Sequence, residues 1–180
     1  MLLSSTGIVY ATRNAPVPDT QYNCEIHEIH SKYFHGEKIT QIECGLRHII
    51  ACTGLGKVFT WGWGIKGQLG VGNMKSSDKP IMVQMPKWTK TLQIKAGLTC
   101  SVVLTDTKKV YWWGTNAIIK MCNQPTVVAL EQLIDVNENF AIKIGSSWSR
   151  TCGIIYLKIA DMSGIQVPGL NKSKVSQQIA

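Results

Sequence analysis

The chain has 180 residues and a formal net charge of +8 at pH 7, with 44% hydrophobic residues. It contains no run of about 18 apolar residues, so the sequence predicts no membrane-spanning helix. Its six cysteines, at positions 24, 44, 52, 100, 122 and 152, show no paired framework. Such cysteines favour an intracellular, reducing compartment over a disulfide-bonded secreted domain.

The N-terminal residues predict a strand followed by a loop. Residues 1–13 begin with an apolar run that Ser4-Ser5-Thr6-Gly7 interrupts, and no charged segment precedes it. This pattern favours a strand over a signal peptide. Pro16 and Pro18 then predict a loop over residues 14–23.

Side chains that can bind metals gather in the next segment, CEIHEIHSKYFH. They are Cys24, His27, His30 and His35, followed at a distance by Cys44 and His48. Thiolate and imidazole groups are zinc ligands. However, His27 and His30 are three residues apart on an expected strand, where such positions point to opposite faces. We therefore expect a solvated sheet edge here, with a zinc site as the alternative, and predict neither metal nor cofactor.

The stretch from Ile39 to Gly72 is partly repeated 52 positions further along the chain. In the repeated positions, Gly45 corresponds to Gly97, Trp61 to Trp113 and Gly62 to Gly114. Internal repetition at this period is typical of solenoids, propellers and arrays.

Each copy predicts a β-hairpin. In the first copy, apolar and β-branched residues over 48–53 and 57–61 flank a Gly54-Leu55-Gly56 loop. In the second copy, residues 101–105 and 109–113 flank a polar loop at 106–108. A unit of 52 residues leaves room for four short strands, the content of one propeller blade.

The order of residues within the unit resembles the repeat of the RCC1 (regulator of chromosome condensation 1) family. A glycine, two residues and a histidine precede an apolar run, which leads into a Gly-Lys-Val-aromatic-Thr-Trp-Gly stretch and then Gly-Gln-Leu-Gly. The residues that carry the motif are Gly45, His48, Trp61, Gly62, Gly67, Gln68, Leu69, Gly70, Gly97, Trp113 and Gly114. In the second copy Cys100 replaces the histidine, and no Gly-Gln-Leu-Gly follows.

The resemblance implies an all-β fold, an incomplete RCC1-like β-propeller of about three to three and a half four-stranded blades. The expected division is a divergent partial blade and loop at 1–38, repeats at 39–90 and 91–137, a partial repeat at 138–160 and a polar tail at 161–180. Within this division, residues 126–130 suit an outer strand and residues 131–139 a linker. The family's propellers have seven blades, so three explanations are open: a half-propeller completed by a second polypeptide, a fragment of a longer protein, or an open arc held in an assembly.

Positive charge is concentrated between Gly64 and Val110. This segment contains eight lysines, two aspartates and no arginine. Such a balance favours acidic partners, namely nucleic-acid backbones, acidic protein tails or anionic membrane surfaces. The alternative is a solvated face of scattered lysines. The candidate partner-binding residues are Lys87, Trp88, Lys90, Lys108 and Lys109. Trp88 is either an exposed anchor for a partner or buried between blades.

The remaining tryptophans have two interpretations as well. Trp61, Trp63, Trp112 and Trp113 could form a platform on which nucleic-acid bases stack. Because Trp61 and Trp113 occupy the same position of the repeat beside a glycine, we expect them to pack between blades.

No phosphate-binding loop, nucleophile elbow or metalloprotease motif occurs, so the sequence predicts no enzyme and no catalytic residue. The favoured function is a non-catalytic, architectural or protein-interaction subunit that docks through propeller faces and lysine-rich loops. The expected partners are other protein chains that cover or complete the propeller. The alternatives are a guanine-nucleotide exchange factor for a small GTPase, as the resemblance implies, or a chromatin- or RNA-binding propeller. Cytoplasm, cytoskeleton or cilium is the favoured compartment, with nucleus and mitochondrion as alternatives.

Overall fold

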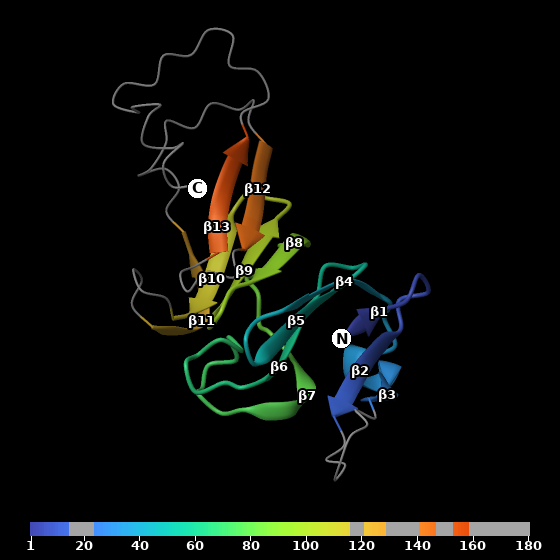
Figure 1. The fold of residues 1–180 in the computed structure, drawn as a ribbon. Coiled ribbons are helices and arrows are strands. Elements are labelled where there is room, and N and C mark those ends of the chain that lie inside the picture. The colour runs from blue at the N-terminus through green and yellow to red at the C-terminus, as the bar shows by residue number, and fades with distance from the viewer. Residues whose placement is uncertain (15–23, 116–120, 129–140, 147–152, 159–180) are drawn as a thin grey trace, which may run out of the picture.

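A computed structural model of the chain describes residues 1–14, 24–115, 121–128, 141–146 and 153–158. These residues form four antiparallel sheets and one short 3-10 helix, η1 (Ser31–Phe34). The expected tail at 161–180 and linker at 131–139 lie outside the described residues. Of the loop expected over 14–23, Asn14 belongs to a strand and residues 15–23 lie outside the described residues. Figure 1 shows the sheets following one another in chain order, each beside the next.

The first sheet has the order β1-β2-β3. Its strands are β1 (Leu2–Leu3), β2 (Val9–Asn14) and β3 (Cys24–Ile29). The N-terminal segment is therefore extended, as the sequence predicts, but it forms two antiparallel strands, β1 and β2, instead of one. Strand β2 pairs with β3 along its whole length.

The second and third sheets are four-stranded meanders that repeat each other. The second sheet contains β4 (Ile39–Cys44), β5 (His48–Thr53), β6 (Val58–Gly62) and β7 (Ser77–Met82). The third contains β8 (Thr91–Ala96), β9 (Cys100–Thr105), β10 (Val110–Gly114) and β11 (Cys122–Val127). Strands β8, β9 and β10 begin 52 positions after β4, β5 and β6, so the hairpins predicted from the repeat are confirmed.

The outer strand β11 begins earlier than predicted. The sequence places this strand over 126–130, whereas β11 runs over Cys122–Val127. Pro125 makes the segment look like a turn, but β11 lies at a sheet edge, where proline is tolerated. The register between β10 and β11 also shifts between Trp112 and Gly114, so the strand bends there.

The innermost strands of successive sheets are neighbours, as in a propeller. Strand β4 lies beside β8, and β8 lies beside β12 (Ala141–Ser146), which pairs with β13 (Gly153–Lys158) in the fourth sheet. The Gln41 amide joins β4 to β8: Nε2 donates to the Leu92 carbonyl at 2.8 Å, and Oε1 accepts from the Ile94 amide at 3.1 Å.

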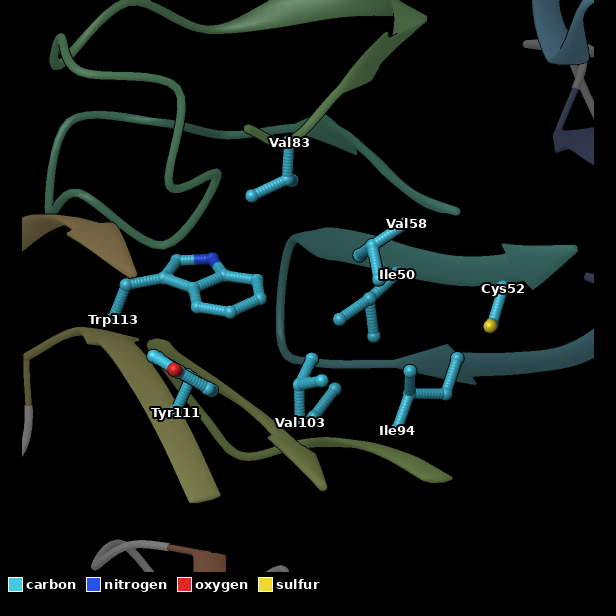
Figure 2. Close-up of a cluster of buried hydrophobic side chains, with 9 residues drawn as sticks. Ile50, Cys52, Val58, Val83, Ile94, Val103, Tyr111 and Trp113 are labelled. Carbon is cyan, nitrogen blue, oxygen red and sulfur yellow. The ribbon is translucent and has the colours of Figure 1, made fainter. Parts of the chain in front are cut away.

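The hydrophobic core lies between the sheets rather than inside any one of them. Alternate residues of β5 and β6 point to opposite faces, so the second sheet is buried on both sides. One face meets the third sheet in a cluster that Figure 2 shows, where Ile50 and Val58 point toward Val103, with Trp113 alongside. The other face packs Ala51, Phe59 and Trp61 against the first sheet and η1.

Candidate functional site

The repeat motif builds the contact between the second and third sheets through a buried polar network. His48 is 1% exposed, and its Nε2 lies 3.1 Å from Ser101 Oγ. Ser101 Oγ donates to the Gln68 carbonyl at 3.0 Å, so His48 Nε2 is the donor to Ser101. The indole Nε1 of Trp113 donates to the same carbonyl at 2.9 Å. One backbone oxygen therefore joins two strands of the next blade.

His48 is held neutral. Burial lowers its pKa to about 4, against an opposing contribution from a hydrogen bond with the Cys100 backbone. A neutral, enclosed imidazole with a fixed partner stabilises the fold and does not act as an acid or base near pH 7. In the second copy Cys100 stands at the same position and is also buried, as a small apolar residue.

The Gly-Gln-Leu-Gly motif and the residues that follow it contact the outer strand of the next blade. The Gly72 amide donates to the Asn123 carbonyl at 2.8 Å, and Asn123 Nδ2 donates back to the Gly72 carbonyl at 3.1 Å. Gly70 has φ +68°, and a Cβ there would lie 2.6 Å from the Trp113 ring. Leu69 is fully buried, and Thr60 Oγ1 donates to its carbonyl at 2.6 Å.

The other motif glycines permit close backbone contacts. Gly62 and Gly114 end their strands with φ values of +103° and +100°. The following amides donate to Arg47 and Thr99 carbonyls at 2.7 and 3.0 Å. Gly45 faces the His48 ring and the Gly97 carbonyl, while Gly67 faces the Cys122 carbonyl.

A second group of predicted residues lies where three loops meet at one end of the second and third sheets. These loops are the β5–β6, β7–β8 and β9–β10 loops. The Asp106 amide donates to the Lys90 carbonyl at 2.9 Å, and the Lys90 amide donates to Asp106 Oδ1 at 3.0 Å. The Thr91 amide approaches the Gly56 carbonyl at 3.4 Å, and a Cβ on Gly56 would lie 2.5 Å from Lys90 Cγ. The exposed side chains of these loops, which we call the tip surface, are Leu55, Lys87, Trp88, Lys90, Lys108 and Lys109.

Trp88 is the most prominent feature of the tip surface. Its side chain is 96% exposed, so the alternative in which it is buried between blades is wrong. Its backbone has φ +65°, a left-handed conformation that is uncommon for bulky residues. Thr89 Oγ1 donates to the Pro86 carbonyl at 2.7 Å across the same turn, so the Thr89 side chain supports this backbone path.

The acidic groups near the tip surface already have partners. Glu37 forms an ion pair with Lys57. Burial raises the pKa of Glu37, but hydrogen bonds from Lys57 and Thr53 and nearby positive charge outweigh it, so the net pKa lies below its usual range. Asp106 accepts from the Lys90 amide. Asp106 keeps its negative charge, but the four lysines of the tip surface outnumber it, so this end carries net positive charge.

The other tryptophans do not form an exposed stacking platform. Trp61, Trp112 and Trp113 are 5%, 8% and 0% exposed. Trp63 is 41% exposed, and the Arg47 guanidinium lies 4.5 Å from its ring centroid. This pair belongs to the loops at the opposite end of the second sheet from Trp88.

The histidine-rich segment shows no metal-binding geometry in the part of the chain that the structure describes. No group of three or more His, Cys, Asp or Glu side chains converges there. His27 and His30 are exposed, and His30 Nδ1 instead accepts from the Lys32 amide at 3.1 Å at the start of η1. The side chain of Cys24 lies outside the described residues. No described helix is long and apolar enough to cross a membrane.

Comparison with known families decides the identity of the repeat. Models described as the regulator of chromosome condensation (RCC1) repeat match residues 39–68 and 56–104. Residues 39–104 of the chain carry RCC1 repeats. Among its relatives, the ultraviolet-B receptor UVR8 of Arabidopsis thaliana is 38% identical over 76 residues, which cover 42% of this chain and 17% of the receptor.

Solved structures agree on the fold. The crystal structure of human WBSCR16 has a TM-score of 0.57 and 25% identity, and the match covers 71% of this RCC1-repeat chain and 36% of that one. Prp20p from Saccharomyces cerevisiae, described with its binding properties to Gsp1p and histones, has a TM-score of 0.57 at 18% identity. That match covers 82% of this chain and 39% of Prp20p.

These comparisons confirm the predicted all-β, incomplete RCC1-like propeller. The matched part of the chain covers 36% of WBSCR16, 39% of Prp20p and 17% of UVR8. The described residues hold two four-stranded blades, with sheets of three and two strands beside them.

Proposed function

We propose that this RCC1-repeat protein is a non-catalytic protein-interaction subunit, and that it docks other chains through its lysine-rich tip surface. The observation that carries the proposal is the exposure of Trp88, at 96%, between lysines on loops that two packed blades hold in place. Tryptophan is enriched among the residues that dominate binding energy in protein interfaces. The repeat-motif residues join the two blades, and this contact fixes the loops of the tip surface relative to each other.

The polar groups of the motif support a structural role. His48, Ser101 and Gln68 are enclosed between blades and bonded to one another, so they offer a substrate no access. We extend the proposal to an intracellular, reducing compartment, because Cys52 and Cys100 are enclosed as apolar thiols. Burial raises the pKa of Cys52 to about 12, which keeps it protonated and unreactive.

The proposal is tested by recovering the tagged full-length protein from its own cells in three forms: wild type, Trp88→Ala and Trp63→Ala. Both substitutions remove an exposed tryptophan, but Trp63 lies in loops at the other end of the second sheet. We expect quantitative mass spectrometry to find partners that Trp88→Ala loses and Trp63→Ala keeps. Identical partner sets for all three forms would contradict docking through the tip surface.

The exchange-factor alternative makes a different prediction. It requires a stable complex with a nucleotide-free small GTPase that dissociates when nucleotide is added. A panel of small GTPases stripped of nucleotide, tested by size-exclusion chromatography, separates the two functions.

A further inference from the structure

We propose that the tip surface binds an acidic, extended peptide segment, with an apolar residue of that peptide packed on the Trp88 indole. This inference rests on the proposed function and names the chemistry of its partner. It draws on three properties of the tip surface: its charge, the cost of the Trp88 conformation, and the way in which the loops are held.

Charge selects an acidic ligand. Lys87 and Lys90 are exposed on the β7–β8 loop, and Lys108 and Lys109 on the β9–β10 loop. Lys38 is exposed at the same end, since its carbonyl accepts from the Gly54 amide of the β5–β6 loop at 3.1 Å. The nearest described carboxylates are already bonded within the fold, Glu37 to Lys57 and Asp106 to the Lys90 amide. These lysines outnumber Asp106, which keeps its negative charge, so a carboxylate-bearing partner would meet net positive charge.

The Trp88 conformation is unfavourable in the free protein in two respects. A left-handed backbone disfavours any residue with a Cβ, and the bulky indole stands in water instead of being packed. An apolar side chain packed on the indole would remove the second cost, which is the exposure of the indole to water. The surface would therefore favour a peptide that carries an apolar residue among its acidic ones.

The loops are held in this geometry before any partner binds. Hydrogen bonds join Lys90 to Asp106 in both directions, and Thr89 bonds to Pro86 across the turn that carries Trp88. A surface that is already ordered loses less conformational entropy on binding than a mobile loop does.

The composition of the surface favours a peptide over nucleic acid or lipid. Its cations are lysines, whereas arginine is the residue that recognises phosphate in a bidentate manner. Trp88 is its one aromatic side chain and Leu55 its other apolar one, so successive bases would find no row of stacking partners. A membrane-binding face needs a continuous apolar stripe, which lysines interrupt here.

The test is fluorescence anisotropy with a fluorescein-labelled peptide of alternating glutamate and aspartate around a central leucine. The full-length wild type is compared with Trp88→Ala and with Lys87→Glu/Lys109→Glu. The matched controls at the opposite end of the second sheet are Trp63→Ala and Lys66→Glu/Lys75→Glu. All these side chains are exposed, so thermal unfolding curves should show that every variant folds.

We expect Trp88→Ala and the tip-surface charge reversal each to weaken the dissociation constant by about tenfold or more, and the control variants to change it by less than about twofold. A peptide with glutamine at every acidic position should not bind. Equal affinity of wild type and Trp88→Ala would overturn the proposal, as would preferential binding of labelled single-stranded DNA or of phosphatidylserine vesicles. If cellular partners depend on Trp88 while the peptide does not bind, the peptide chemistry is wrong and the docking function stands.

Discussion

Trp113 and Gln68, 45 positions apart, are joined by a hydrogen bond of 2.9 Å from the indole Nε1 to the Gln68 carbonyl. The Ser101 hydroxyl donates to the same oxygen and accepts from His48. The loop of one blade therefore organises two side chains of the next. A repeat unit cannot bury both of its faces alone, and hydrogen bonds of this kind fix the position of the next unit against it.

Ser101→Ala should lower the free energy of unfolding by about 1–3 kcal/mol, because it leaves the buried His48 Nε2 without a partner. Urea denaturation of Ser101→Ala, of Trp113→Phe and of the double variant measures the loss of stability in each and the coupling energy between the two side chains. Since both side chains donate to the Gln68 carbonyl, the two losses should not add. Strict additivity would show that the network does not act as a unit.

Gly70→Ala should be among the most destabilising single changes in the described blades. The new Cβ would lie 2.6 Å from the Trp113 ring, and the ring cannot move without losing its bond to Gln68. We expect a loss of about 3 kcal/mol, from steric overlap added to the left-handed strain.

Gly36→Ala is the matched control for that change. Gly36 has φ +75°, but no atom lies within 4 Å of a Cβ built there. Its cost should be the backbone strain alone, about 1 kcal/mol. Equal losses of stability for Gly36→Ala and Gly70→Ala would contradict the role assigned to the contact with Trp113.

The local structure followed from the sequence because each copy of the repeat carries its own signals. Glycines end the strands, and a short polar or glycine-containing loop separates two β-branched runs, so β5, β6, β9 and β10 could be predicted from the printed residues. Strand β11 was harder, because Pro125 indicates a turn unless the strand is known to lie at a sheet edge.

The contacts between blades could not be predicted in the same way. The bonds from Gln41 to Leu92 and from Trp113 to Gln68 join residues about one repeat apart, and nothing in the local sequence specifies such partners. The exposure of Trp88 was equally undetermined, because lysines flank buried and exposed tryptophans alike. The charge of the tip surface was visible in the sequence, but its assembly from three loops was not.

His48 predicts a loss of stability in mild acid. Its pKa is about 4 in the folded protein and about 6.5 when unfolded. Between these values the unfolded chain binds a proton that the folded chain does not, so the free energy of unfolding falls as the pH falls from 6.5 toward 4. The slope should approach about 1.4 kcal/mol per pH unit, or about 3 kcal/mol in all.

Urea denaturation at a series of pH values checks this slope, with His48→Gln as the comparison. Glutamine does not titrate, and His27, His30 and His35 are exposed and present in both proteins. The slope of His48→Gln should therefore be shallower by most of the predicted amount, whatever its absolute stability. Parallel curves for the two proteins would mean that His48 is not the titrating group.

Gln41→Leu should weaken the contact between the innermost strands β4 and β8. The variant removes the acceptor for the Ile94 amide and the donor to the Leu92 carbonyl, so we expect a loss of about 1–2 kcal/mol. The specific readout is hydrogen exchange at the Ile94 amide, which should accelerate. Thr40→Val is the control, since Thr40 Oγ1 bonds to Cys52 within the second sheet. If Thr40→Val accelerated exchange at Ile94 as much as Gln41→Leu does, the effect would reflect general loosening of β4 and not the loss of the Gln41 bridge.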